Sequence, residues 1–402
     1  MKKLLIIISL CIYIPFINAE VKEKEEIHID SIKEETTTNE EDSLNLAPNA
    51  KSAIMIEAST GKIIYEKNAD EQLAMASMTK MMTLLLIMEN IDNGNLKWDE
   101  LVTASEHAAS MGGSQIFLEV GEQMTVEELV KGICIASGND ASVAMAERIG
   151  GTEANFVKMM NDKARELGLT STNFENACGL DTKNHYSSAK DMAIIAKNLV
   201  KYEKILEYTG TYEDYLRKNT DNSFWLVNTN KLVRYYQGVD GLKTGYTGEA
   251  GYCITTTARR NGMRLITVVM GEETAAIRNS ETTSMLDYGF NTYQIDTILS
   301  KDAVISKKEV LLGEENTVEV LPKEDITILN TKIGTKRNIT YELELDNIKA
   351  PVKQGDVVGK INIIEDNKTI MTIEAIAKTN IKKLNIFKAY YQELLDILKG
   401  NL

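Results

Sequence analysis

The chain has 402 residues, of which 43% are hydrophobic and 26% charged, and its formal net charge is −14. This length is enough for two domains, and the composition is that of a globular protein with a sizeable core. The acidic balance argues against a nucleic-acid-binding protein, because binding to the phosphate backbone favours a basic face.

Residues 1–19 have the pattern of a secretory signal peptide. Lys2 and Lys3 give a basic start, the run 4–17 is almost unbroken apolar chain interrupted by Pro15, and Ala19 suits cleavage. The run is short for a membrane span, and an uncleaved anchor is the alternative interpretation. Export out of the cytoplasm is therefore expected. Residues 20–46 are acidic and poor in apolar residues, which predicts a disordered linker.

Residues 47–290 are expected to form one domain whose sheet takes strands from both ends of the segment. Two apolar runs flank a glycine-containing turn near the start, and two more flank Asn261-Gly262, a strong hairpin signal. The predicted strands are 53–56, 63–65, 252–259 and 263–270. Helical patterns lie between and after them, at 77–89, 125–136, 141–149, 153–167, 189–201 and 284–290. A sheet with helices packed on it is the architecture that this order favours.

Residues 291–379 show a different pattern, in which short Val, Ile, Thr and Leu runs alternate with charges. This predicts an all-β domain, a β-sandwich with a structural or spacing role. Its clearest strands are 316–321, 325–329, 339–345 and 369–375. Residues 380–402 return to a helical period with one apolar face. That amphipathic helix is expected to dock either on a membrane surface, as an anchor, or on its own domain.

Cysteine usage indicates no disulfide framework. Beyond the signal segment the cysteines are Cys134, Cys178 and Cys253, an odd number. One bridge is an alternative, but buried thiols are the favoured state.

The first motif that carries chemistry is Ser77 followed by Lys80. Residues three apart on a helix share a face, and a serine at a helix start lies near unpaired backbone N–H groups and the positive end of the helix dipole. A neutral Lys80 can take the hydroxyl proton when burial and a second cation lower its pKa. The alternative role for Ser77 is a helix N-cap.

Two further motifs follow in the chain. Ser137-Gly138-Asn139 lies between two apolar helical runs, where a loop can direct a hydroxyl and an amide into a cleft. Lys243-Thr244-Gly245 lies on a short predicted strand and offers a cation and a hydroxyl to a carboxylate, while the glycine admits a ligand close to the backbone. The alternatives are a loop with N-cap residues and a solvated edge-strand lysine.

Serine–lysine pairs at this spacing also occur at Ser59 and Ser187. Ser59 lies in the predicted turn between two strands, so it cannot share a helix face with a lysine. Ser187 has no S-x-N string between it and Lys243. Only Ser77 satisfies both the helix requirement and the order of the motifs.

In this order the three motifs resemble the signature of penicillin-binding proteins and class A β-lactamases. The chain is most similar to the low-molecular-mass penicillin-binding proteins, which are serine D-alanyl-D-alanine carboxypeptidases, and the resemblance covers nearly its whole length. Residues 176–181, 185–189, 191–193 and 228–232 also resemble segments of that family. Gly138 stands where β-lactamases usually have Asp, which fits the carboxypeptidases better.

The resemblance implies an α+β fold. A β-lactamase/transpeptidase-like domain, an antiparallel sheet with helices on both faces, would be followed by a small all-β domain and the amphipathic C-terminal helix. It also implies catalytic roles: Ser77 is the acylated nucleophile, Lys80 its base, and Ser137 a proton relay. His185 would be a loop residue, at best a neighbour of the site.

The implied substrate-binding residues come from the second and third motifs. Asn139 would bond the peptide portion of the substrate, and Lys243 and Thr244, with Gly245 beside them, would hold its terminal carboxylate. The oxyanion hole would be the backbone N–H groups of Ser77 and Tyr246. The family often has His at position 246, so the role of the Tyr246 side chain stays open.

The resemblance therefore predicts removal of the terminal D-alanine from peptidoglycan stem pentapeptides through a Ser77 acyl-enzyme. β-Lactam antibiotics would be trapped covalently by the same serine. No cofactor, metal or nucleic acid is implied, and the expected location is the extracytoplasmic face of the membrane or the cell wall.

Four other functions are alternatives to this one. A Ser-His-Asp hydrolase would need G-x-S-x-G or another exposed nucleophile with histidine support, and that string is absent. A class A β-lactamase resembles this chain but uses a glutamate within E-x-x-L-N to deacylate, and no such string lies between Ser137 and Lys243. A zinc peptidase needs a ligand cluster, whereas the histidines are only His28, His107 and His185. A catalytically slow wall-binding scaffold protein remains an alternative.

Overall fold

The computed structural model describes residues 44–334, 337–385, 387 and 390–391. The predicted signal peptide, residues 20–43 of the predicted linker and most of the predicted C-terminal helix lie outside the described residues. Ala47 is already fully buried, so ordered packing begins a few residues earlier than the first predicted strand. Among the described residues, no helix combines the length and the apolar character that a membrane crossing requires.

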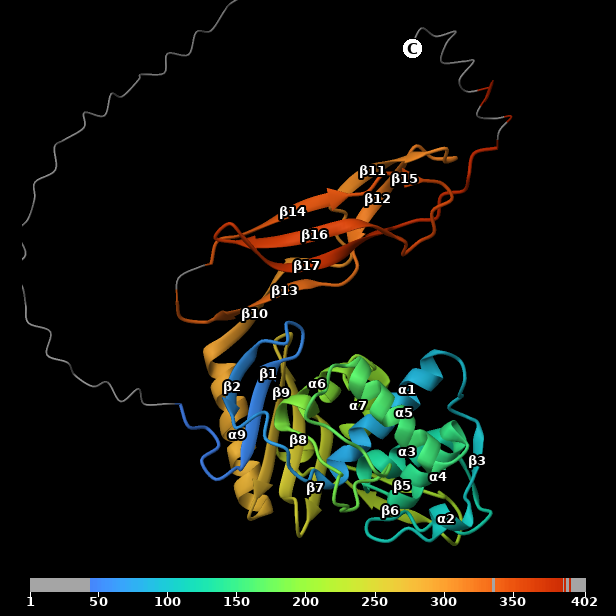
Figure 1. The fold of residues 1–402 in the computed structure, drawn as a ribbon, viewed down its shortest axis with the longest axis vertical. Coiled ribbons are helices and arrows are strands. Elements are labelled where there is room, and N and C mark those ends of the chain that lie inside the picture. Colours follow the sequence, from blue (N-terminus) through green and yellow to red (C-terminus); the bar gives the residue numbers. More distant parts are fainter. Residues whose placement is uncertain (1–43, 335–336, 386, 388–389, 392–402) are drawn as a thin grey trace, which may run out of the picture. The chain divides into compact units, whose positions relative to one another are not determined.

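The first domain is built on a five-stranded antiparallel sheet with the order β2-β1-β9-β8-β7 (Figure 1). Its strands are β1 (Ser52–Glu57), β2 (Ile63–Lys67), β7 (Val239–Thr247), β8 (Gly251–Arg260) and β9 (Met263–Glu272). The sheet thus joins strands from both ends of the segment, as the sequence predicts. Asn261 and Gly262 form the β8–β9 turn with φ of 50° and 82°, the conformation of a tight hairpin.

Both faces of this sheet are covered, which explains why β1, β7, β8 and β9 are buried along most of their length without alternation. On β1, Ile54 and Ile56 belong to the larger hydrophobic cluster with the helical region, whereas Ala53 and Met55 belong to a second cluster with α9 (Ala275–Thr292). Figure 1 shows α9 along one face of the sheet and α6 on the other side. The predicted α+β architecture is confirmed.

Helix α9 begins nine residues before the predicted start at residue 284. Its first half is mostly polar, so periodicity does not reveal it, but the Thr274 hydroxyl accepts from the Ile277 N–H and caps the helix. The remaining helices are α1 (Lys80–Asp92), α2 (Glu106–Ala109), α3 (Val126–Ile135), α4 (Asn139–Gly150), α5 (Glu153–Glu166), α6 (Ala189–Leu199), α7 (Glu203–Thr209) and α8 (Leu232–Tyr235). The prediction missed α2, α7 and α8, which are short.

The helical region also contains two small ribbons that the sequence analysis did not predict. They pair β3 (Leu101–Thr103) with β4 (Gln123–Thr125), and β5 (Glu213–Leu216) with β6 (Phe224–Val227). Each strand has only three or four residues, too few for an alternating pattern to be distinguished from a loop.

The second domain is all-β, as predicted. A six-stranded sheet has the order β14-β16-β17-β12-β11-β15, and β10 pairs with β13 in a separate ribbon. The strands are β10 (Tyr293–Leu299), β11 (Ser306–Leu311), β12 (Thr317–Pro322), β13 (Ile326–Thr331), β14 (Ile339–Leu345), β15 (Ile348–Lys349), β16 (Val357–Glu365) and β17 (Lys368–Ala377). Its hydrophobic core includes Val320, Ile361 and Ala375, all fully buried.

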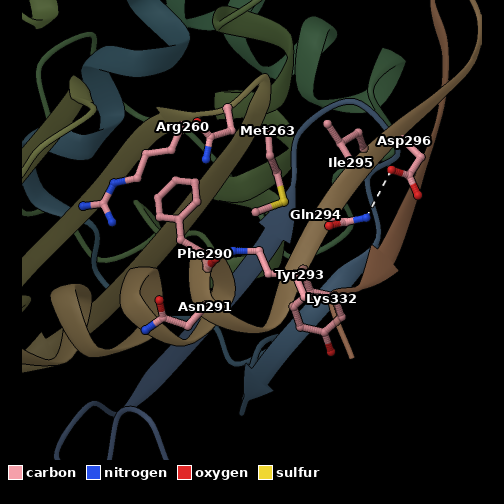
Figure 2. Close-up of a pocket in the computed structure, with 10 residues that line it drawn as sticks. Arg260, Met263, Phe290, Asn291, Tyr293, Gln294, Ile295, Asp296 and Lys332 are labelled. Atoms are coloured by element: carbon pink, nitrogen blue, oxygen red, sulfur yellow. Dashed lines mark hydrogen bonds between the residues drawn. The ribbon is translucent and has the colours of Figure 1, made fainter. Parts of the chain in front are cut away.

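A cavity of about 420 Å³ lies at the junction of α9 and β10 (Figure 2). The Arg260 guanidinium lies 4.7 Å from the Phe290 ring centre, and the Lys332 ammonium donates to the Phe290 carbonyl at 2.6 Å. None of the site residues that the sequence predicts lines this cavity. The residues of the three motifs lie elsewhere, in the first domain.

Candidate active site

Ser77 lies on a tight turn that leads into a buried helix. A 3₁₀ turn (Ala76–Thr79) precedes α1, so Ser77 stands just before the first residue of the α-helix rather than within it. Ala76 has φ of 48°, a left-handed conformation that is rare for a residue with a side chain. Lys80 Nζ donates to Ser77 Oγ at 2.8 Å, which confirms that the two side chains share one side of this turn.

Lys80 is fully buried, and its ammonium is held by three acceptors. Besides Ser77 Oγ, it donates to Asn139 Oδ1 at 2.7 Å and to the Cys178 carbonyl at 2.6 Å. Burial lowers the pKa of Lys80 to about 8, although the charge of Asp140 opposes this shift. The neutral form of Lys80, which can accept a proton, is thus far easier to reach near physiological pH than in an exposed lysine.

The second motif lies between α3 and α4, as the sequence predicts. Ser137 has φ of 64° and is nearly buried, a strained conformation of the kind found at functional sites. Asn139 is the first residue of α4; it accepts from Lys80 and donates from Nδ2 to the Gly112 carbonyl at 2.6 Å. The second motif is therefore connected directly to Lys80 of the first motif.

The third motif lies on β7, one of the two edge strands of the five-stranded sheet. Lys243 is 1% exposed, so it is not a solvated edge-strand lysine, and its ammonium donates to the Thr244 carbonyl at 2.9 Å. Burial, and then the charge of Lys80, lower the pKa of Lys243 well below its ordinary value. Thr244 Oγ1 donates to Thr229 Oγ1 at 2.7 Å.

A glycine is required at position 245 because β7 approaches closely the 3₁₀ turn that carries Ser77. A Cβ at this position would lie 2.8 Å from the Met75 carbonyl oxygen and 3.1 Å from the Ser77 amide nitrogen. Any side chain at position 245 would therefore separate the strand from the turn. Tyr246 follows with a side chain that is 59% exposed and lies against Tyr252, with the ring centres 4.3 Å apart.

These elements enclose an open pocket of about 330 Å³. It is lined by Ser77, Ser114, Ser137, Thr229, Thr244, Gly245, Tyr246, Tyr252, Ala275 and Arg278. Lys80, Asn139 and Lys243 are buried, and each contacts a residue of one of the three motifs. The structure thus brings the eight residues predicted from sequence to one place. It shows no group of three or more His, Cys, Asp or Glu residues arranged for a metal ion among the described residues.

Sequence reasoning missed Arg278, which lines the same pocket from α9. Arg278 is 5% exposed, and its guanidinium donates to the Cys253 carbonyl at 3.4 Å and to the neighbouring Asn279 side chain at 2.9 Å. It makes no ion pair among the described residues, so a strong cation faces the pocket without an acidic partner. The sequence around it holds no motif; the only signal is a lone arginine in a polar stretch of helix.

Comparison with known proteins agrees with this geometry. A family model described as D-alanyl-D-alanine carboxypeptidase matches residues 35–274, and a model of the penicillin-binding protein 5 C-terminal domain matches residues 293–383. The chain belongs to the D-alanyl-D-alanine carboxypeptidase family. It is a serine-type D-Ala-D-Ala carboxypeptidase, a hydrolase that acts on the cell wall.

Similar proteins come from several bacteria. D-alanyl-D-alanine carboxypeptidase DacF of Bacillus subtilis is 53% identical over 339 residues, covering 84% of this chain and 87% of the relative. Penicillin-binding protein 5 of Haemophilus influenzae is 32% identical, with a TM-score of 0.66, and covers 83% of this chain and 98% of its own. Penicillin-binding protein 3 of Streptococcus pneumoniae is 31% identical, with a TM-score of 0.68. The match covers 83% of this chain and 99% of the pneumococcal chain.

Proposed function

We propose that this carboxypeptidase removes the terminal D-alanine of peptidoglycan stem pentapeptides through an ester on Ser77. The observation that carries the proposal is the 2.8 Å contact between Ser77 Oγ and the buried Lys80 ammonium, at the wall of an open pocket. A neutral Lys80 takes the hydroxyl proton as Oγ bonds to the penultimate D-alanine carbonyl. The C–N bond then breaks, and the leaving amine receives a proton through Ser137. Water finally hydrolyses the ester.

Two backbone N–H groups are proposed to stabilise the oxyanion, those of Ser77 and Tyr246. The short distance from the Gly245 Cβ position to the Ser77 nitrogen supports this pairing, because it puts the strand and the turn side by side. A preorganised donor of this kind contributes about 3 kcal/mol to transition-state stabilisation.

The terminal carboxylate is proposed to bind at the opposite wall of the pocket, to Thr244 and Arg278, with Lys243 adding positive charge from below. Arginine presents a planar pair of donors that matches a carboxylate, and this one lacks an acidic partner among the described residues. Asn139 would bond the peptide portion. Tyr246 and Tyr252 would form the wall beside the C-terminal residue.

The same serine is proposed to react with β-lactam antibiotics. Penicillin-binding protein D2 of Listeria monocytogenes, 34% identical over 60% of this chain, has been solved in ampicillin-bound and cefotaxime-bound forms. An opened lactam ring leaves an ester on the nucleophile, as the peptide does, so the shared motifs support trapping at Ser77.

We further propose the division of the chain that the sequence predicts: a signal peptide over 1–19, a linker over 20–46, a catalytic domain over 47–290 and a second domain over 291–379. Export, and attachment of the C-terminal helix (380–402) to a membrane surface, rest on sequence patterns alone. Both are tested by fractionating cells that produce the full chain and a version ending at residue 379.

The catalytic assignment is tested with Ser77→Ala. We expect the variant to lose labelling by a fluorescent penicillin and to lose D-alanine release by about 10⁴-fold or more, because the covalent route is removed. Ser59→Ala is a matched control, since Ser59 belongs to the same kind of serine–lysine string but lies between β1 and β2. Persistent labelling of Ser77→Ala contradicts the assignment, and rapid turnover of nitrocefin by the native chain favours a β-lactamase.

A further inference from the structure

A buried histidine lies behind the nucleophile turn, outside the substrate pocket. His185 is 4% exposed and lies in the segment between α5 and α6, ten residues after Glu175. Its Nε2 lies 2.7 Å from Thr79 Oγ1, and its Nδ1 accepts from the Glu175 backbone N–H at 2.9 Å. It therefore contacts the turn that carries Ser77, although it does not line the pocket.

The hydrogen bonds fix which ring nitrogen carries the proton. A backbone N–H can only donate, so Nδ1 must present a lone pair to Glu175. Nε2 then carries the proton of the neutral ring and donates it to Thr79 Oγ1. The Thr79 hydroxyl in turn donates to the Ala76 carbonyl at 2.8 Å. The result is a chain of hydrogen bonds that all run in one direction, from the Glu175 N–H through His185 and Thr79 to the carbonyl of Ala76, the residue before Ser77.

Ala76 needs such support because of its conformation. A residue with a side chain at φ of 48° costs about 1–2 kcal/mol relative to the usual helical region, and it persists only where its surroundings hold it. The loop also packs on the Ala76 carbonyl at Gly179, where a Cβ would collide with that oxygen. The backbone conformation of Ala76 sets the direction of the Ser77 side chain, because the two residues are adjacent. A change in the backbone angles of Ala76 therefore moves Ser77 Oγ relative to Lys80 Nζ.

We propose that His185 is a positioning residue, which acts through Thr79 to hold the Ala76 carbonyl and thereby the direction of Ser77 Oγ. This inference rests on Ser77 being the nucleophile. His185 exchanges no proton with the substrate in this role. It contributes geometry, and its loss lowers the rate of acylation while leaving noncovalent binding of the substrate nearly unchanged.

Burial favours a neutral histidine. It is the largest effect and lowers the pKa of His185 to about 4, with a smaller contribution from Lys80, while Glu175 and Asp181 oppose the shift. A charged ring would require Nδ1 to give up its bond with Glu175. The charge of Lys80 would also oppose a charged ring.

The test compares acylation of Ser77 by a chromogenic or fluorescent penicillin in four single variants and one double variant. Thr79→Val and His185→Leu each remove one partner, and we expect each to slow acylation about 10-fold to 100-fold with the noncovalent dissociation constant changed less than twofold. The double variant should be no slower than the slower single variant, because the two residues act as one unit. His185→Gln, whose amide can still donate to Thr79, should recover most of the rate.

Thr83→Val is the matched control. Thr83 is also fully buried on α1, and its hydroxyl donates to the Ala177 carbonyl at 2.6 Å, so it joins the same helix to the same loop without reaching Ala76. We expect it to lower the melting temperature but not the acylation rate. If His185→Leu does not fold, Thr79→Val and His185→Gln still decide the matter.

Three results overturn the proposal: a native acylation rate in folded Thr79→Val, an effect confined to binding, or equal slowing in Thr83→Val. Failure of the proposed nucleophile is distinguishable from these results, since the native chain itself would then carry no penicilloyl group on Ser77 in a peptide map.

Discussion

The two domains bury different kinds of side chain. Among the described residues, every buried polar or charged side chain lies between Ser52 and Thr282, in the first domain, whereas the second domain buries apolar groups alone. Removing a charge from water is costly unless hydrogen bonds replace the lost hydration. The first domain meets that cost at Lys80, Lys243 and Arg278, all of which lie at or just beneath one pocket. Buried charge therefore distinguishes the domain that contains the proposed active site from the all-β domain.

After Ser77→Ala, we expect the largest loss of activity from Arg278→Leu, which removes one of the buried charges of the first domain. Removing a charged hydrogen-bond donor from a bound carboxylate costs about 2–3 kcal/mol, so we expect kcat/KM for D-alanine release to fall roughly 30-fold to 150-fold. The measurement is steady-state release of D-alanine from a pentapeptide.

A substrate with an amidated C-terminus provides the control for Arg278. It lacks the carboxylate, so the native chain and Arg278→Leu should process it at similar low rates. A variant that loses activity equally on both substrates would show that Arg278 supports the fold of the pocket instead of binding the carboxylate.

The next effect is the pH dependence that the buried base imposes. In the proposed mechanism the reactive form of Lys80 is neutral, so we expect activity to rise with pH and to level off above the pKa of Lys80, which burial lowers to about 8. We expect kcat/KM to rise about tenfold per pH unit below that value. Stopped-flow acylation between pH 6 and 9.5 measures it.

Lys243 also has a lowered pKa, so its titration could produce a similar pH dependence and must be distinguished from that of Lys80. In Lys243→Arg the third-motif residue stays charged at every accessible pH. The rising limb near pH 8 should survive in this variant, even if the maximum rate falls. Disappearance of that limb would assign it to Lys243.

Sequence reasoning succeeded where residue type and spacing carry the information. Ser77 and Lys80 share a side because they lie one turn apart, and the β8–β9 hairpin follows from Asn261-Gly262. The order of the motifs then singled out one of three serine–lysine strings. These inferences depend on local geometry or on a familiar pattern, both of which a single chain displays.

What the sequence did not supply comes from contacts between distant segments. Arg278 reaches the pocket because α9 packs on β8, and His185 reaches Thr79 across 106 residues of chain. Neither residue stands in a periodic pattern that marks its target. The strained φ of Ala76 and of Ser137 is equally invisible, because tertiary packing and not residue preference holds it.

The smallest effect on activity is expected from a substitution in the second domain, which tests the contrast between the domains from the domain without buried polar side chains. Ile361 lies fully buried on β16 in a core of aliphatic side chains. Ile361→Val removes one methylene and should lower the free energy of unfolding by about 1 kcal/mol. Calorimetry of the full chain measures this loss, and D-alanine release should stay within twofold of the native rate.

The matched substitution Ile54→Val, in the larger core cluster of the first domain, removes the same group beside the helices that carry the site. If Ile361→Val reduced activity as much as Ile54→Val does, the second domain would contribute to catalysis without a buried polar group of its own.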